Sequence, residues 1–296
     1  MRRSADGDLT DRQIHGFAGM QAANYMWASV YAQYRPEVFD DRLTRGGPVV
    51  RRAASWGVYP SFSTDDRKRL VASIDPGYGR NAEGAASYHI NTSLRYRPAP
   101  NLTLSLGPSY SHSESSAQFV RSFDDPTASA FFGQRTVFAD LAQRTLSMDT
   151  RVEATFTPDL TLELFLQPFV SAGEYHGFKE FVRPRALDKH VFGDTELAPI
   201  VDPNGRTTGY ALDSDSDPAT APLTWANPDF SFRSLRGNAV LRWEYRPGST
   251  VFLVWQQQRA ADSSSGDFRF GRDTRGIFDG APDNIFLVKL SYWLGR

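Results

Sequence analysis

Three aspartates at alternate positions form the most metal-like motif of the sequence. Asp213, Asp215 and Asp217 have the spacing of the first ligands of a calcium loop, in which oxygen atoms surround the ion. Such a loop also needs glycine at its sixth position and glutamate at its twelfth, where this chain has Pro218 and Thr224. We therefore predict a solvated acidic loop and no metal site.

The histidines show no catalytic or metal-binding pattern. No two of them have the His-Glu-x-x-His spacing that brings two ring nitrogens to one zinc ion. Outer-membrane phospholipases place a histidine and a serine two residues apart on the outward face, but His112 is followed two residues later by Glu114. We expect neither chemistry from the five histidines, which are His15, His89, His112, His176 and His190.

Carboxylates in the long segment after Ala172 are the remaining candidates for catalysis. Two carboxyl groups can hydrolyse a glycosidic bond when their separation suits an acid and its nucleophile or base. The candidates are Glu174, Glu180, Asp188, Asp194 and Glu196. The sequence does not give their separation, and loops are acidic for solubility alone. Glycan hydrolysis by the outer loops therefore stays an alternative.

The composition excludes several further classes. The chain has 296 residues and no cysteine, which rules out disulfides, thiolate metal sites and a cysteine nucleophile. The net charge is -1 and the arginines are scattered, so the basic surface that nucleic-acid binding needs is missing. We assign no catalytic, cofactor-binding or metal-binding residue and expect no cofactor and no nucleic-acid partner.

The elements that position these residues are long strands. From Thr145 to Ala172, polar and apolar residues alternate through a tight turn at Thr157 to Asp159. A period of two over such runs is the pattern of two paired strands. Strands of soluble proteins average about 5–6 residues, whereas an oblique bilayer crossing takes about 9–11. We therefore predict that Leu162, Leu164 and Leu166 face lipid.

Other runs are also predicted as strands, with the same alternation except at 250–259, where Val251, Leu253 and Trp255 compete with Phe252 and Val254 for the apolar side. They cover residues 55–62, 70–78, 87–97, 102–113, 234–246, 250–259 and 286–294, and two more strands are expected within residues 9–36. No run approaches 18 consecutive apolar residues, so no transmembrane helix is predicted. We predict an all-β, antiparallel up-and-down transmembrane β-barrel with about 11 to 12 strands.

The connections between these strands form two groups that alternate along the chain. Tight turns lie near residues 64–67, 98–101, 157–159 and 246–249, and long connections near residues 37–54, 114–142, 173–231 and 261–284. Short periplasmic turns and long outer loops are typical of outer-membrane barrels. Because residues 114–142 begin and end on the loop side, we predict that Gln134 to Asp140 belongs to an outer hairpin above the membrane.

The strand number and the start of the chain point to a partial barrel. A count of eleven is odd, whereas single-chain bacterial barrels have an even number of strands. The first residues also lack the apolar region of an export signal. We expect residues 1–296 to be one barrel domain that is an N-terminally truncated part of a larger barrel.

Four prolines fall inside predicted strands, where proline cannot donate to the ladder. We expect bulges or strand ends at Pro60, Pro76, Pro108 and Pro168.

Each face of the predicted barrel carries a characteristic set of side chains. Charged residues of the polar face can pair across strands in a wet interior. They are Arg95, Arg97, Asp149, Arg151, Glu153, Glu163, Arg236, Arg242 and Glu244. Aromatic residues near the turn-side ends suit an interfacial girdle. They are Tyr96, Phe156, Trp243, Tyr245 and Tyr292.

Several short strings in this order resemble one family. They are Arg-Gly-Gly-Pro at 45–48, Thr-Pro-Asp-Leu at 157–160, Gln-Pro-Phe-Val at 167–170, Asn-Pro-Asp-Phe at 227–230 and Val-Lys-Leu-Ser-Tyr-Trp-Leu-Gly-Arg at the end. Over roughly residues 40–296, the chain resembles the C-terminal barrel of a domain-of-unknown-function family. Its full-length members carry an N-terminal, family-nine-like carbohydrate-binding domain. The resemblance implies an outer-membrane location and an association with carbohydrate, but no settled activity and no catalytic residues.

The sequence therefore predicts a barrel in the cell outer membrane, with the lipid bilayer and glycans as partners. The expected role is a channel, receptor or surface anchor linked to carbohydrate binding or uptake. Two alternatives remain, a glycan hydrolase acting through its outer loops and a soluble β-sandwich binding module.

Overall fold

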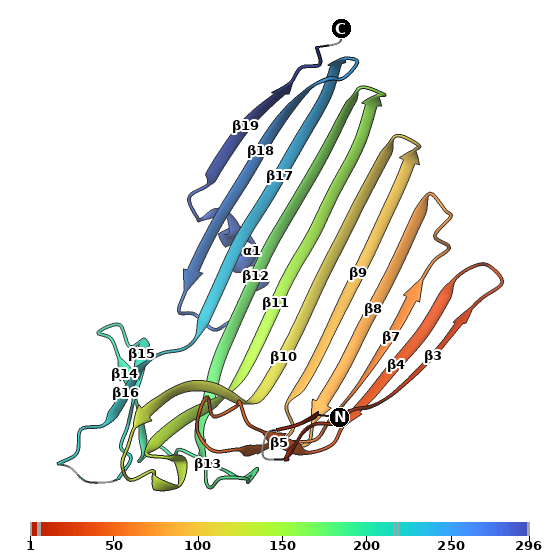
Figure 1. The fold of residues 1–296 in the computed structure, drawn as a ribbon. Helices are drawn as coiled ribbons and strands as arrows, with labels where there is room; N and C mark the ends of the chain where they lie inside the picture. Colours follow the sequence, from red (N-terminus) through yellow and green to blue (C-terminus); the bar gives the residue numbers. More distant parts are fainter. Residues whose placement is uncertain (1, 5–6, 216, 218, 295–296) are drawn as a thin grey trace.

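A single antiparallel sheet dominates the computed structural model, which describes residues 2–4, 7–215, 217 and 219–294. Its strands follow one another across the sheet in chain order, so the topology is up-and-down (Figure 1). From one edge to the other they are β3 (Ile14–Gln21), β4 (Trp27–Arg35), β7 (Ser55–Ser63), β8 (Leu70–Asn81), β9 (Ala86–Ala99), β10 (Leu102–Asp124), β11 (Gln134–Thr157), β12 (Leu160–Phe181), β17 (Phe230–Arg246), β18 (Ser249–Ser263) and β19 (Asp283–Ser291). A short strand, β13 (Lys189–Val191), pairs with β12 as the twelfth. The predicted fold class is confirmed.

The sheet is one wall and not half of a sandwich. Within the described residues, β3 and β19 each pair with one neighbour and form its two edges. Among the described residues, the small sheet of β14 to β16 packs only on the loop-side ends of β11 and β12, and their turn-side parts face no second sheet. The soluble β-sandwich alternative is therefore wrong. In the same residues, no helix has both the length and the apolar composition needed to cross a membrane.

The smaller elements lie in the connections. They are β1 (Arg2–Arg3), β2 (Leu9–Asp11), β5 (Val38–Asp40), β6 (Val50–Arg52), η1 (Ser129–Phe131), β14 (Leu197–Val201), β15 (Thr207–Leu212), β16 (Leu223–Ala226), α1 (Phe270–Arg275) and η2 (Gly276–Phe278). Most of them gather at one end of the sheet, opposite the tight turns (Figure 1). The predicted separation of short and long connections is confirmed.

The longest hairpin continues well beyond the length of a membrane crossing. Strands β10 and β11 pair from Leu102 with Ala154 to Asp124 with Gln134. Residues 134–140 therefore form the upper part of a hairpin, as predicted, but they belong to the same continuous strand as residues 141–157. Register shifts lie between Ser115 and Gln118 and between Phe119 and Arg121, where bulges bend the hairpin.

The prediction of bulges or strand ends at the four prolines is wrong. Pro108 pairs with Met148 on one side and Pro168 with Leu235, and no register shift occurs at either position. Pairing is instead interrupted on the other side, between β9 and β10 near Pro108 and between β11 and β12 near Pro168. A strand tolerates proline there because the missing N–H falls where the ladder is already interrupted. Near Pro108, the Thr92 hydroxyl donates to the proline carbonyl at 3.0 Å.

The register divides the sheet into an apolar face and a polar face. Between the tight turns and the bulges, the apolar face carries the even-numbered residues of β3, β4, β7 to β12 and β19. On β17 and β18 it carries the odd-numbered residues. Leu162, Leu164 and Leu166 all belong to it, as predicted. Large hydrophobic residues such as Ile90 and Leu94 are 40% and 38% exposed on this face. An apolar face that protein does not bury is the hallmark of a barrel wall in lipid.

Two regions outside this wall contribute further hydrophobic clusters. We call residues 37–54, 114–142 and 173–231 the head; it contains one cluster around Val137, Phe178 and Trp225 and a second around Val50 and Phe138. We call residues 264–282, which include α1 and η2, the strap. Its Ile277 packs on the sheet in a third cluster.

Candidate functional site

The polar face of the sheet carries linked polar side chains. At the β3 edge, Gln13 donates to the Tyr31 hydroxyl at 2.7 Å and to the Gln33 side-chain oxygen at 2.9 Å. Gln33 in turn donates to the Tyr59 hydroxyl at 3.0 Å, and the Tyr59 ring stacks on His89 with centroids 5.8 Å apart. Polar side chains from the segment before β3 and from β4, β7 and β9 are thus linked along one face.

Similar pairs continue across the centre of the sheet. The Ser61 hydroxyl donates to Asp75 at 2.5 Å, Ser109 donates to Asn91 at 2.6 Å, and Gln167 donates to Asp149 at 2.8 Å. Each pair joins neighbouring strands, so hydrogen bonds on this face satisfy much of its polarity. Such a surface suits a water-filled interior.

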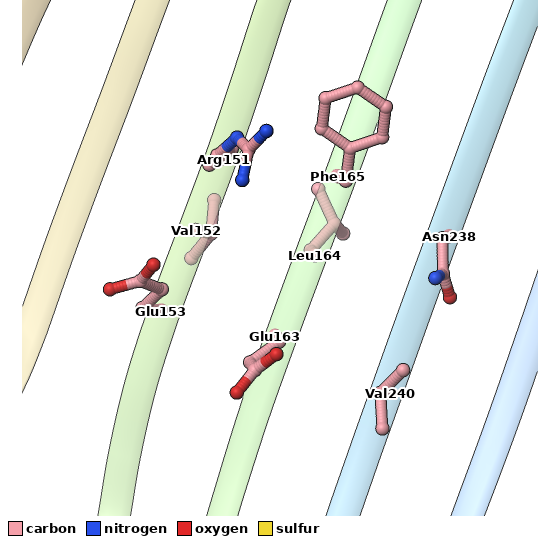
Figure 2. A pocket seen from close by; sticks show the side chains of 8 residues that line it. All are labelled: Arg151, Val152, Glu153, Glu163, Leu164, Phe165, Asn238 and Val240. Carbon is pink, nitrogen blue, oxygen red and sulfur yellow. The ribbon is translucent and has the colours of Figure 1, made fainter.

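Two carboxylates stand opposite each other in the middle of the polar face. Glu153 and Glu163 are direct cross-strand partners on β11 and β12, and they border a hollow of about 260 Å³ (Figure 2). Arg151 lies beside them, with its guanidinium carbon 5.1 Å from the Phe165 ring centre. Neither glutamate has a hydrogen-bond or ion-pair partner among the described residues. Two like charges opposite each other disfavour the pairing of their strands, and here they leave a negative spot in the wall.

The register places the predicted charged residues together. Arg95, Arg97, Asp149, Arg151, Glu153, Glu163, Arg236, Arg242 and Glu244 all lie on the polar face. Arg242 and Glu244 form an ion pair at 2.9 Å. The prediction that these residues share one face is confirmed.

The predicted aromatic girdle also lies on one face, at the turn-side ends of its strands. Tyr96, Phe156, Trp243 and Tyr292 are exposed at the turn-side end of the apolar face. Tyr245 packs against Trp243 with ring centroids 6.1 Å apart. Their role as membrane anchors stays a prediction.

The three aspartates of the acidic loop accept hydrogen bonds from the backbone of that loop. Asp213, Asp215 and Asp217 each accept a backbone N–H from two residues further on, at 3.4, 3.0 and 2.9 Å. These are Asx turns, which shape a loop locally. Among the described residues, no group of three or more potential ligand side chains is placed to hold a metal ion.

The candidate catalytic carboxylates are spread over the head. Glu180 pairs with Arg135 at 2.8 Å, and Arg135 also pairs with Asp125 at 2.7 Å. Glu196 accepts from the Gly193 N–H at 2.9 Å and lies 2.8 Å from His190 Nε2. Asp188 lies 3.7 Å from Arg183, whereas Glu174 lies lower on β12.

Two of these carboxylates have opposite environments. Burial raises the pKa of Glu180, although Arg135 opposes this effect. The hydrogen bond from the Gly193 backbone and the one with His190 lower the pKa of Glu196. Glu180 of β12 and His190 of β13 are cross-strand partners, and His190 also contacts Glu196. Glu180 and Glu196 therefore both lie beside the short ladder between β12 and β13.

The histidines lie in three places, and His176 of β12 lies near Glu114, as His112 does. His15 and His89 lie in the aromatic ladder of the polar face, His112 bonds Glu114 at 3.2 Å, and His190 bonds Glu196.

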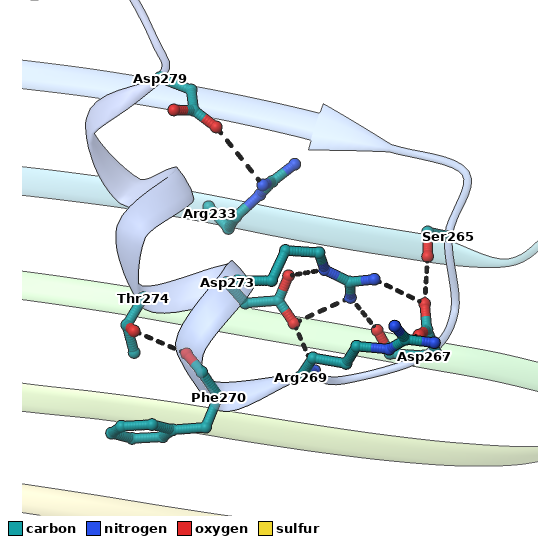
Figure 3. A network of polar contacts seen from close by, with 9 residues as sticks. Arg233, Ser265, Asp267, Arg269, Phe270, Asp273, Thr274 and Asp279 are labelled. Carbon is teal, nitrogen blue, oxygen red and sulfur yellow. Dashed lines mark hydrogen bonds and ion pairs between the residues drawn. The ribbon is translucent and has the colours of Figure 1, made fainter.

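The strap is the feature that sequence reasoning missed. Residues 261–284 were expected only as a long outer connection, yet the strap folds back onto the wall (Figures 1 and 3). The signal was present as four apolar residues, Phe268, Phe270, Ile277 and Phe278, interleaved with glycines in a segment too irregular for a strand.

Together, the up-and-down topology, the two unlike faces and the long loop-side connections define the wall of a transmembrane β-barrel. A solved structure agrees on the fold. The chain is similar to the siderophore receptor PiuA from Acinetobacter baumannii, with 12% identity and a TM-score of 0.50, over 96% of this chain and 45% of that one. A copper transporter, OprC, is 13% identical over 97% of this chain and 41% of that one, with a TM-score of 0.42. This chain thus spans less than half the length of either protein.

The particular family follows from residues 2–295, which match the model of DUF5916, a domain of unknown function. The chain belongs to this family. No curated protein matches it.

Proposed function

We propose that this chain forms wall and head of an outer-membrane barrel that acts as a channel or receptor for a polar solute. The solute would pass or bind along the polar face, while the apolar face meets lipid and the head faces the outside. The proposal includes residues 1–296 as one barrel domain.

The contrast between the two faces carries this proposal. Hydrogen-bonded polar pairs line one side of strands β3 to β12, while the other side exposes Ile90, Leu94 and their neighbours. Glu153 and Glu163 have no partners among the described residues, so they do not stabilise the barrel. These charges instead suit a surface that selects or steers ions and polar molecules.

A carbohydrate is the solute class that we propose first. Its support is the sequence resemblance to barrels with a carbohydrate-binding domain, together with a polar face rich in hydroxyl and amide groups. Sugars present the same groups, so such a face can exchange hydrogen bonds with them along its length.

Electrical recordings on the full chain in planar bilayers test the channel role. We expect a conductance whose cation preference falls in the double variant Glu153→Gln, Glu163→Gln, because both charges lie on the polar face. Asp188→Asn in the head is the matched control and should leave the preference unchanged. Added oligosaccharide should reduce the current by occupying the path. Absence of any conductance and of any oligosaccharide binding would contradict the proposal.

A glycan hydrolase is the second candidate, favoured by one observation. Glu180 and Glu196 have pKa values shifted in opposite directions, and such a difference is what an acid and a base need. If this reading holds, the parent chain releases reducing sugars from a glycan panel and Glu180→Gln or Glu196→Gln abolishes the release. An inactive parent would remove this candidate.

A further inference from the structure

The strap is docked on the apolar face, at the height where that face ceases to be apolar. Ile277 is 7% exposed and packs with Val170 and Leu235. Phe268 reaches further across the sheet, to Tyr110 on β10, with ring centroids 6.4 Å apart. All three partners on the sheet belong to the apolar face, so the strap covers the side that we assign to lipid.

The docking is close because glycines face the sheet. A Cβ atom on Gly266 would lie 2.8 Å from the Cα of Glu174, and one on Gly280 would lie 2.5 Å from the Ala260 carbonyl oxygen. Real Cβ atoms do not approach so closely, so these positions require glycine while the backbone stays where it is.

Ionic contacts fix the strap internally and to the wall. Asp273 is 1% exposed and accepts from the Arg269 backbone N–H at 2.7 Å and from Arg272 Nε at 2.8 Å (Figure 3). Arg233 of β17 lies 3.8 Å from Asp279. Hydrogen bonds from Ser265 and Arg272 lower the pKa of Asp267 to about 2, so this carboxylate stays charged at neutral pH.

The height of the strap matches the edge of a membrane. On β12, the apolar face carries no charge from Leu160 to Val170, which at about 3.3 Å per residue and a tilt of about 40° gives a band about 25 Å tall. The first charges of this face beyond the band are Arg144, Glu174, Arg233 and Arg259. The strap lies over this boundary, since it contacts both Val170 and Arg233.

The outward side of the strap has the composition of an interfacial element. Phe270 and Phe278 are 65% and 64% exposed. The Arg269 side chain is 74% exposed, and its Nε pairs with Asp267 at 2.8 Å, which leaves its other nitrogens open to the outside. Arg275 is exposed as well, and its side chain has no bonding partner among the residues that the structure describes. Aromatic rings beside guanidinium groups are the combination that inserts at the headgroup level of a bilayer.

We propose that the strap is a lipid-binding element, in which Phe270 and Phe278 enter the outer edge of the bilayer and Arg269 and Arg275 bind phosphate groups of lipid headgroups. Its lipid occupant follows from continuity with the apolar face, which extends directly below it. This proposal rests on the membrane setting of the proposed function and adds a specific lipid contact to it.

Single cysteines for spin labels can test it, because the chain has none of its own. The full chain is placed in vesicles of phosphatidylcholine with phosphatidylglycerol, and each label is exposed to oxygen and to a water-soluble nickel complex. Phe270→Cys should report more oxygen and less nickel than Phe132→Cys, a 72% exposed residue of the head. Leu164→Cys in the apolar band is the reference for full lipid exposure.

Three outcomes separate the possible failures. If the Phe270 label behaves like the Phe132 label, the strap does not touch lipid. If it is shielded from both reagents, protein covers it, and the proposal is also wrong. If the Leu164 label itself reports water, the membrane setting fails and the proposed function fails with it.

Lipid selectivity tests the phosphate contact. Spin-labelled phosphatidylglycerol should associate with the chain more strongly than phosphatidylcholine, by about fivefold for each arginine near the surface. The double variant Arg269→Gln, Arg275→Gln should lose this preference, whereas Arg183→Gln, an exposed arginine of the head, should keep it. Equal selectivity in all three proteins would overturn the phosphate assignment.

Discussion

The wall and the head share several strands but differ in how far their hydrophobic side chains are buried. In the wall, Ile90 and Leu94 remain 40% and 38% exposed on a part of the apolar face that the strap does not reach. In the head, Phe138 and Leu212 are each 1% exposed. The hydrophobic side chains of the wall therefore need lipid to cover them, whereas those of the head are buried against one another.

Strand β11 runs through both regions and shows where the wall ends and the head begins. Between Thr145 and Phe156, every second residue except Thr150 is apolar, because one face meets lipid and the other water. Val137, Phe138 and Ala139 are instead consecutive and all buried. Val137 and Ala139 join one cluster and Phe138 the other, so this part of the strand is covered on both faces. Loss of the alternation thus marks the end of the wall.

The largest expected effect comes from breaking the core of the head. Phe138→Ala removes a buried ring that meets Phe119 and Phe181 edge to face, which should cost about 3–5 kcal/mol of head stability. Hydrogen exchange of the upper β11 amides measures this loss. Phe132→Ala, at a 72% exposed position, should change the exchange by less than about 0.5 kcal/mol. Similar losses in both variants would mean that the head has no distinct core.

Charging the apolar face should have the next largest effect. Leu164→Arg places a charge near the middle of the apolar band and should cost about 2–4 kcal/mol of membrane stability. Heat-modifiable migration of the folded barrel in gels measures assembly. Glu163→Gln, one residue away on the polar face, should assemble normally. Equal behaviour of the two variants would remove the assignment of the faces.

The smallest expected effect is a pH dependence within the head. Because burial raises the pKa of Glu180, the folded head holds this proton more tightly than the unfolded chain. Glu180 therefore adds stability below its unfolded pKa, and this contribution is lost as the pH rises through the folded pKa.

Thermal unfolding of the parent and of Glu180→Gln between pH 4 and pH 8 checks the sign. The parent should lose stability relative to the variant as the pH rises. Asp125 has a lowered pKa, so its own contribution has the opposite slope. A parent that gains stability relative to the variant at high pH would show that the ion pair with Arg135 outweighs burial.

The comparison also explains how far the sequence could predict the structure. Alternation from Leu160 to Val170 was sufficient to predict the strand, its faces and the tight turn before it, because one solvent on each side produces a period of two. In the head, residues 134–140 have neighbours on both sides, and no periodic pattern indicates which segments cover them. The carboxylates Glu180 and Glu196 were identified, but their partners Arg135 and His190 depend on tertiary packing.

The strap escaped prediction for a different physical reason. Its close contact depends on Gly266 and Gly280, whose effect is visible only once the opposing backbone is known. The prolines were misjudged for a similar reason, since one side of an otherwise regular ladder can be interrupted without a change of register.

Cysteine scanning of β12 tests the central claim most directly. Single cysteines from Leu160 to Ser171, in a chain with no native cysteine, are reacted in intact membranes with a water-soluble, membrane-impermeant maleimide. Two opposite faces predict labelling at odd-numbered positions such as 163 and 167 and protection at even-numbered positions such as 162 and 164. Uniform labelling along the strand would contradict the account.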